Sequence, residues 1–450
     1  MSSQSKQMKV KTGLTQFFCS CCVASVLLPA APVCAAEPGV AAPAAPPGSV
    51  DHRRHLPEWL DFSGYLQSSY RQPTRRDKPL NAVQRVWLES TVNNGGMVRA
   101  FASANLDADL AVYGRREADE DLWSSEVREA YLTLDTRHID VIAGLQQLRW
   151  GEADSLSTFD IINPVDYRNP IATARSSQRL SVGALDLRAS LGGTGLLDAV
   201  VVPRPRFSKM PDHGAPWEGT SLALLREHEQ QGLADLDEEQ GDSPEFASRL
   251  KFYRSGYDLA FLFYSGYEHS PRYSRDQAAA SLRPHIIASY ERYEAYGIST
   301  AVSFWDSTLR SELACKPHYP FQSDAIRVEQ RTDYQAIVGW DRNFLTNLNI
   351  NVQVFFFVYD GDAVPGKDRE RYGYSWSVSD KFMDDALTAG IRGEVFANNQ
   401  DYAIEFFSEY EYDDHLRFSL GMMLLGGKAE NDLGQFDAND HVYVGIKYSF

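Results

Sequence analysis

Charged side chains recur at every second position inside several segments that are otherwise apolar. When carboxylates and guanidinium groups line one face of a sheet that surrounds water, they can discriminate between solutes by charge. The excess of acid among them favours cations or neutral solutes, unless these charges only keep a water-filled wall soluble. The positions of this kind are Glu89, Glu129, Arg392, Glu394, Glu405, Glu409, Glu411, Arg417 and Lys447.

A second group of candidate residues lies in and next to the segment near 151–176, which has no strand periodicity. Trp150 directly precedes this segment, and Asp154, Asp160 and Asp166 are its acidic members. Asp side chains accept hydrogen bonds from nearby backbone N–H groups, and the prolines of this segment stiffen it. We expect an ordered loop that folds into a lumen and narrows it, which makes these four residues constriction candidates. The alternative is a surface loop whose acids only cap turns.

Enzymatic and metal-binding chemistry finds little support in the sequence. His213, His228, His269 and His285 lack the spacing of a metal site, and no G-x-S-x-G motif follows residue 36. A pI of 5.1 and a net charge of −17 argue against nucleic-acid binding, because phosphate contacts need clustered Lys and Arg. We therefore expect no catalytic residue, no cofactor and no metal.

The elements that carry the charges have the pattern of β-strands with one apolar face, because side chains alternate faces along a strand. Most of these strands are about 10–14 residues long, as a tilted strand needs to cross a bilayer. A soluble sandwich also alternates, but its strands are usually about five or six residues long. The clearest apolar rows are Leu348, Ile350, Val352, Val354, Phe356 and Val358; Leu387, Ala389, Ile391 and Val395; Tyr402, Ile404, Phe406 and Tyr410; and Leu416, Phe418, Leu420, Met422 and Leu424.

Long and short links alternate between these strands, which is typical of outer-membrane barrels with tight periplasmic turns and longer external loops. The pattern predicts an all-β, transmembrane, antiparallel up-and-down barrel of about 18 strands, with 16 as the alternative and both termini periplasmic. Trp59, Tyr65, Tyr412 and Tyr448 are expected in interfacial aromatic girdles. The expected short turns include 254–256, 295–298, 384–385 and 413–414, and the expected external loops include 203–244 and 310–323, the latter carrying Cys315.

The first residues have the pattern of an export signal. Lys6, Lys9 and Lys11 precede an apolar run, and small residues before Glu37 offer a cleavage site. We expect a signal peptide over 1–36, a disordered periplasmic leader over 37–56 and the barrel over 57–450. In the acidic segment 203–244 we expect a solvated loop with a short helix over 222–236; binding of divalent cations that bridge lipopolysaccharide is the alternative.

Two stretches carry a resemblance to known barrels. The apolar row of 441–450 ends on Phe450 and resembles the terminal strand of bacterial outer-membrane barrels, whose closing Phe is read by the barrel-assembly machinery. Upstream, a combination of three motifs resembles a poorly characterised family of proteobacterial outer-membrane barrels, porin-like and distantly akin to alginate-export barrels. The matching positions are Arg128, Glu129, Ala130 and Tyr131; Gly144, Gln146, Trp150, Gly151 and Asp154; and Asn163, Pro164 and Asp166.

The resemblance implies a Gram-negative outer-membrane location, with outer-membrane lipid and lipopolysaccharide as surroundings. Together with the charged rows it predicts a channel for passive passage of a small solute. The alternative is a structural, assembly or export barrel that sheathes a partner or a polymer. Neither the solute nor the oligomeric state follows from the sequence.

Overall fold

The computed structural model describes residues 57, 59–93, 95–114, 121–153, 155–170, 178–276, 283–324, 326–344 and 347–450. The expected signal peptide and leader, and Asp154, lie outside the described residues.

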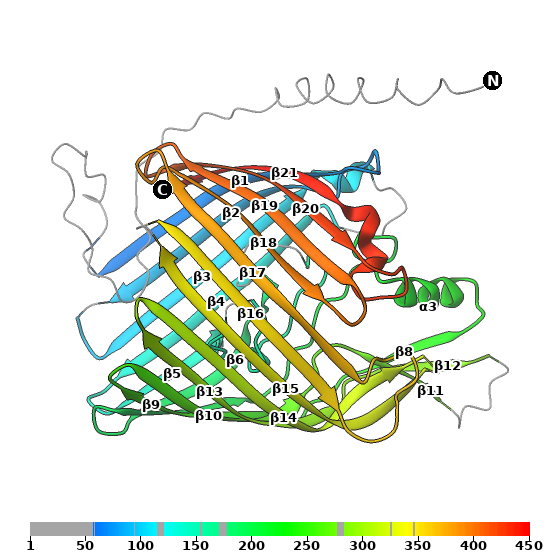
Figure 1. Ribbon diagram of the computed structural model, residues 1–450, viewed down its shortest axis with the longest axis horizontal. Coiled ribbons are helices and arrows are strands. Elements are labelled where there is room, and N and C mark those ends of the chain that lie inside the picture. The colour runs from blue at the N-terminus through cyan, green and yellow to red at the C-terminus, as the bar shows by residue number, and fades with distance from the viewer. Residues whose placement is uncertain are drawn as a thin grey trace.

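Eighteen antiparallel strands form one closed barrel (Figure 1). The first strand, β1 (Leu60–Pro73), pairs with the last, β21 (His441–Ser449), in a register that runs from Tyr65–Ser449 to Pro73–His441. Because β1 and β21 pair with each other, the sheet has no free edge. The backbone N–H and C=O groups of the wall therefore have hydrogen-bond partners on neighbouring strands. The prediction of an all-β barrel of about 18 strands is confirmed, and the alternative of 16 is excluded. The other barrel strands are β2 (Asn81–Asn93), β3 (Val98–Asp109), β4 (Trp123–Asp135), β5 (Ile139–Gln146), β6 (Val182–Ser190), β7 (Gly195–Val202), β9 (Glu245–Arg254), β10 (Tyr257–Tyr267), β13 (Arg292–Phe304), β14 (Ser307–Ser323), β15 (Arg327–Phe344), β16 (Leu348–Tyr359), β17 (Glu370–Phe382), β18 (Leu387–Phe396), β19 (Asp401–Glu411) and β20 (Leu416–Gly426).

The two ends of the barrel differ in the length of their links. At one end, which also holds the start of β1 and the end of β21, links of two to four residues join the strands. We call it the short-turn end. At the other, the loop end, the longest links are 147–181, 203–244 and 268–291. The link 203–244 contains α3 (Thr220–Gln230), which overlaps the expected helix range of 222–236 but begins two residues before it, and 235–239 forms a strand instead. The loop end also carries the 3₁₀ helices η2 (Leu110–Gly114) and η3 (Gly434–Asn439) and a small sheet of β8 (Asp235–Glu239), β11 (Arg272–Asp276) and β12 (His285–Ser289).

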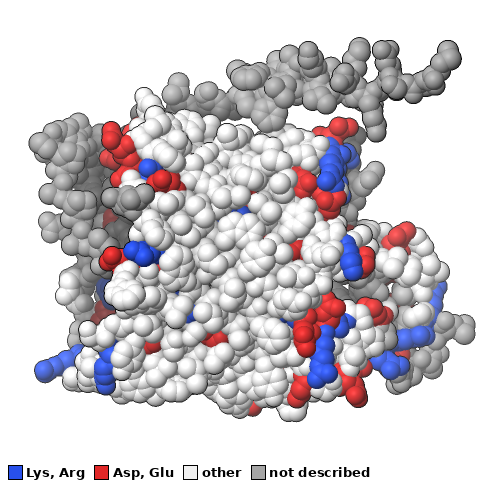
Figure 2. All heavy atoms as spheres, in the orientation of Figure 1, with Lys and Arg blue, Asp and Glu red and all other residues white. Residues whose placement is uncertain are grey.

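The outer face of the wall is apolar. Val354 and Phe356 of β16, Phe406 of β19 and Leu420 of β20 are each more than 40% exposed, as the predicted apolar rows require. Figure 2 shows the same face as a broad uncharged area between two charged edges, at the two ends of the strands. In the part of the chain that the structure describes, no helix is long and apolar enough to cross a membrane.

Residues 292–323 are arranged differently from the prediction. The expected turn 295–298 lies within β13, and the expected external loop 310–323 lies within β14; the true links are 305–306 and 324–326. Pro317 and Pro320 suggest a loop, but the register shift between Lys316 and Tyr319 is a β-bulge that absorbs an irregular stretch within the strand. Cys315 is therefore not in an external loop: it pairs with Tyr296 on the outer face of β13 and β14.

One aromatic residue also departs from its expected place. Trp59 and Tyr412 are exposed. Tyr65 instead stacks on Trp87, whose indole N–H donates to Glu89, and Lys447 lies 4.1 Å from the centre of the Tyr65 ring. These partners belong to the inward row of β1, β2 and β21. A tyrosine on a strand fits either face, and here the polar neighbours select the lumen.

Candidate functional site

The link 147–181 between β5 and β6 folds into the barrel, and we call it the docked loop. Its two stems are joined by Asn163, which is almost fully buried. The Asn163 side chain accepts a hydrogen bond from the backbone N–H of Leu148 at 2.6 Å and donates to the carbonyl oxygens of Gln146 and Leu180 at 3.0 and 2.8 Å. One amide thus closes the base of the loop, which explains an Asn at this position of the motif.

Glu312 of β14 holds the tip of the docked loop against the inner wall. Its carboxylate is completely buried. It accepts hydrogen bonds from the backbone N–H groups of Glu152, Ala153 and Thr158 at 2.7, 2.9 and 2.7 Å. The hydroxyl groups of Ser157 and Thr158 donate to it as well, at 3.0 and 2.9 Å. A single side chain of the wall therefore satisfies five donors of the loop.

Gln353 of β16 is a second anchor. Its Oε1 accepts from the backbone N–H of Ser155 at 2.9 Å, and its Nε2 donates to the carbonyl oxygen of Leu156 at 2.7 Å. Gly151 permits the tight path between these anchors, because a Cβ at this position would lie only 1.8 Å from Oγ of Ser157. Gly151 is therefore needed for the close packing of the docked loop.

Apolar side chains of the docked loop fill the space beneath it. Trp150, Phe159 and Ile162 are buried in one cluster with residues of β6 to β14. The wall makes room with small inward residues, namely Ala184, Ala247, Ala260, Ala295 and Ala314. Gly297 contributes in the same way, since a Cβ there would overlap the Phe159 ring. We call the wall from β6 to β16 the covered wall.

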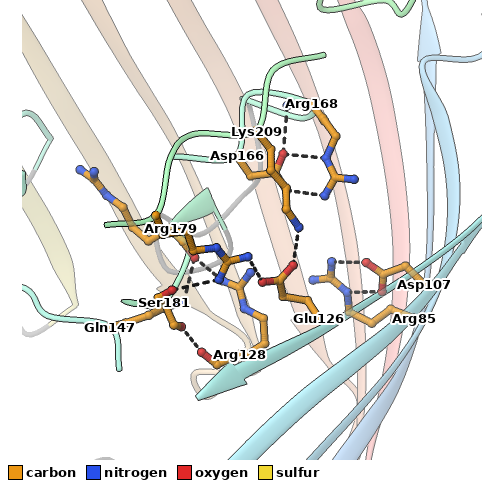
Figure 3. A network of polar contacts seen from close by, with 11 residues as sticks. Arg85, Asp107, Glu126, Arg128, Gln147, Asp166, Arg168, Arg179, Ser181 and Lys209 are labelled. Carbon is orange, nitrogen blue, oxygen red and sulfur yellow. Dashed lines mark hydrogen bonds and ion pairs between the residues drawn. The ribbon is translucent and has the colours of Figure 1, made fainter. Parts of the chain in front are cut away.

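A charged network ties β4 to the other side of the docked loop and to the start of the link 203–244 (Figure 3). Glu126 forms ion pairs with Arg206 and, at 2.5 Å, with Lys209. Arg128 donates to the carbonyl oxygen of Arg179 at 2.8 Å. Nearby, Arg85 and Asp107 form a two-pronged pair with distances of 2.8 and 2.7 Å.

Within this network, Asp166 interacts with Arg168. Burial raises the pKa of the Asp166 carboxyl, but the guanidinium and backbone N–H of Arg168 outweigh it and hold that pKa below its ordinary value. Asp166 therefore stays ionised at neutral pH, and it stabilises the local turn at 166–168.

A cavity of about 1380 Å³ runs beside the docked loop. Its lining includes Ser155 and Leu156 of the loop, and Gln322 and Asp368 near the loop end. It also includes three residues within three positions of the short-turn end, namely Arg310, Asp341 and Asn349. The cavity thus extends along most of the height of the strands, between the docked loop and the wall opposite.

That opposite wall, β17 to β21 and β1 to β3, is called the open wall. Arg392 donates to Glu405 at 2.6 Å, and the Tyr443 hydroxyl donates to the other Glu405 oxygen at 2.7 Å. Arg392, Glu394 and Glu405 all line the cavity. Nearer the short-turn end, Arg417 pairs with Glu409 and Glu411.

The remaining candidates lie at the base of the docked loop. Trp150 is only 5% exposed and packs under the Arg249 guanidinium rather than against the cavity. Glu129 accepts from the backbone N–H of Gln147 at 3.0 Å, and Asp160 lies 3.4 Å from Arg179. Sequence reasoning missed Glu312 and Gln353. The inward alanines of neighbouring strands were the available signal, since they leave space that a loop must fill.

Among the described residues, no group of three or more His, Cys, Asp or Glu side chains could hold a metal ion. One histidine at the loop end has two acidic partners. His285 of β12 lies 2.7 Å from Asp237 of β8 and 3.4 Å from Asp276 of β11. Its hydrogen bonds with these two carboxylates raise the pKa of His285 above its ordinary value.

Solved barrels share this architecture at very low sequence identity. OccAB3 of Acinetobacter baumannii superposes with a TM-score of 0.52 at 9% identity, over 87% of this chain and 99% of that one. OpdK of Pseudomonas aeruginosa superposes with a TM-score of 0.52 at 8% identity, over 87% and 98%. A second OpdK structure, with vanillate, gives 0.51 at 8% identity, over the same 87% and 98%. The fold is that of bacterial outer-membrane porins.

Sequence comparison gives the family. No curated protein matches the chain. A family model described as a protein of unknown function, DUF1302, matches residues 69–358, which cover the end of β1, β2 to β15, the docked loop and most of β16. The similarity to alginate-export barrels remains a prediction. The chain belongs to the DUF1302 family.

Proposed function

We propose that this protein is a porin-like channel of the outer membrane, through which a small solute passes without an energy source. The docked loop is the constriction of this channel. In this proposal the short-turn end and both termini face the periplasm, and the export signal and Phe450 serve delivery and insertion. Lipid and lipopolysaccharide surround the apolar outer face.

One observation carries the proposal. The cavity beside the docked loop is lined by residues from near both ends of the strands, and Ser155 and Leu156 form its inner side. A loop placed only to fill the barrel would need no such passage along its flank. Five hydrogen-bond donors held by Glu312 keep the loop in a fixed position, as a constriction of defined width requires.

Planar-bilayer recordings test the proposal. The purified protein should give discrete conductance steps. Leu156→Trp should lower the step size and Leu156→Ala should raise it, because this side chain borders the cavity. Leu224→Ala, an exposed change on α3, is the matched control and should leave the step unchanged. Absence of conductance would contradict the channel and favour a barrel that sheathes a partner or polymer.

A further inference from the structure

Strands β13 and β14 part before they reach the loop end. Their pairing ends at Tyr296 and Cys315. Beyond this pair, β13 stays paired with β10 on its other side, and β14 stays paired with β15. The wall therefore has a split between 292–295 of β13 and 316–323 of β14, which we call the side split.

On the outer face, an apolar groove of about 600 Å³ reaches the side split. Its lining includes Tyr296 and Cys315, the last pair before the split. Further from the split it includes Ile298, Leu313 and Phe356, each of which is at least 40% exposed. The volume lies within the range of about 300–1,000 Å³ that is typical of small-molecule sites. A groove with this lining suits a hydrocarbon chain, because transfer of apolar surface out of water is favourable.

The side split lies where the outer face of the wall changes from apolar to polar. The outward row of β13 runs from Ile298 and Tyr296 to Glu294, and all three side chains are exposed. On β15 the same change occurs between Tyr334 and Gln330, which are also exposed. Exposed aromatic residues at the edge of an apolar band mark the surface of a bilayer. In the proposed orientation, the split therefore opens at the level of the lipid head groups of the outer leaflet.

On the inner face, two aromatic rings lie across the side split. Tyr293 of β13 and Tyr319 of β14 contact each other edge to face, with ring centroids 5.2 Å apart. Tyr293 is only 5% exposed, whereas Tyr319 lines the cavity beside the docked loop. The cavity and the outer groove thus approach the same place in the wall from its two sides, and this ring pair lies between them.

Side chains hold the loop-end part of β14 on the side that faces the split. The Tyr319 hydroxyl donates to Glu268 at 2.7 Å. The side chain of Gln322 accepts a hydrogen bond from the backbone N–H of Tyr273 at 2.6 Å and donates to the Tyr273 carbonyl oxygen at 3.0 Å. Contacts of single side chains can break without unpairing a strand. The Tyr319 ring can therefore move aside while the rest of the β13–β14 pairing keeps the barrel closed.

We propose that the side split is a lateral opening between the cavity and the outer leaflet, and that it admits a single-chain amphiphile such as a long-chain fatty acid. The hydrocarbon chain lies in the outer groove, and the polar head stays at the membrane surface near the exposed His318. Displacement of Tyr319 then lets the molecule pass between the groove and the cavity. This inference goes beyond the proposed channel, because it gives the cavity a second entrance, from the membrane.

Photolabelling in phosphatidylcholine vesicles tests the proposal. The vesicles contain the protein and a palmitic acid with a diazirine in its chain, and albumin in the bath removes the free fatty acid from the water. Mass spectrometry then locates the labelled residues. The wild-type protein should be labelled at Tyr296 and Cys315 in the groove, and also at Tyr319 and 268–273, which face the cavity. A phosphatidylcholine with the same diazirine chain should label the groove alone; labelling of 268–273 by it would contradict a single-chain ligand.

Two variants sharpen this test. Tyr319→Ala removes the ring that separates the cavity from the split, and it should raise the labelling of 268–273 severalfold. Tyr372→Ala is the matched control, because Tyr372 is an exposed tyrosine on the outer face of β17 and lies outside the groove. Its labelling of 268–273 should equal that of the wild-type protein.

Labelling confined to outward residues in the wild-type protein would overturn the lateral opening, whether or not Tyr319→Ala folds. Conductance of the same preparations separates this result from the fate of the channel. Conductance steps with labelling of the groove alone would contradict the lateral opening and leave the channel intact. Labelling of 268–273 without any conductance step would support the opening and contradict the channel.

Discussion

The covered wall and the open wall are built from the same alternating strands but treat their inward positions in opposite ways. On the covered wall the inward positions beneath the docked loop are small or buried, as with Ala295 and Glu312. On the open wall they carry partly exposed charges such as Arg392 and Arg417. The comparison teaches that the size and charge of inward side chains depend on what they contact, which is the docked loop on one wall and water on the other.

The largest expected effect comes from breaking the covered wall at Glu312. In Glu312→Ala the five donors of the docked loop lose their acceptor, and buried donors without partners cost about 1–3 kcal/mol each. We expect the loop to detach, with a larger conductance step and faster proteolysis within 155–170. Glu409→Ala is the control, because that carboxylate is 42% exposed and belongs to the open wall. An unchanged step in Glu312→Ala would show that this anchor does not hold the constriction.

A second test addresses packing rather than charge. Gly151→Ala places a methyl group against Ser157, and we expect a loss of about 1–3 kcal/mol, the usual cost of overpacking. Unfolding in denaturant, followed by the change in gel mobility of the folded barrel, measures this loss. At Gly183 a Cβ would meet no atom within 4 Å, so Gly183→Ala should unfold like the wild-type protein. Equal stability of the two variants would disprove tight docking at Gly151.

A substitution on the open wall should change the unfolding free energy far less than Gly151→Ala does. Arg85 and Asp107 are paired at 2.7 Å, but their side chains are 25% and 16% exposed. Partly hydrated pairs contribute about 1 kcal/mol or less. Arg85→Gln should therefore change the unfolding free energy by no more than this. A loss as large as that of Gly151→Ala would mean that the two walls do not differ in the way described.

The smallest effect concerns the small sheet at the loop end. Because the folded-state pKa of His285 is raised by Asp237 and Asp276, the stabilisation it contributes is fully present below the ordinary value of 6.5. It is lost as the pH rises through the raised value. Hydrogen exchange of 235–239 and 285–289 should therefore quicken as the pH rises above 6.5 and through the raised pKa of His285, beyond the intrinsic dependence of exchange. His285→Asn should remove this extra dependence; if it persisted, another group would be responsible.

Most of the fold was predictable because the lipid-facing rows alternate without interruption. Phe356, Phe406 and Leu420 face outward as expected. The prediction was wrong for 292–323, where two prolines and a bulge within β14 imitate a loop. That error also hid the main anchor, because Glu312 was assigned to an external segment and could not be expected in the lumen.

The candidate site was predictable only in part. The inward loop was expected from its turn-forming residues, and the structure has such a loop at 147–181. The residues that hold this loop could not be predicted, because Glu312 is 154 positions from Thr158 and Gln353 is 198 positions from Ser155. Contacts at such separations depend on the closed barrel and not on local patterns.

The most direct test of the docked loop as a constriction uses a single cysteine at Ser155, in a Cys315→Ser background. Ser155 lines the cavity and its backbone N–H is held by Gln353. We predict that a bulky methanethiosulfonate reagent lowers the conductance of Ser155→Cys stepwise as it reacts, and that a reducing agent restores it. A fully labelled channel that keeps its original conductance would contradict a constriction at this loop.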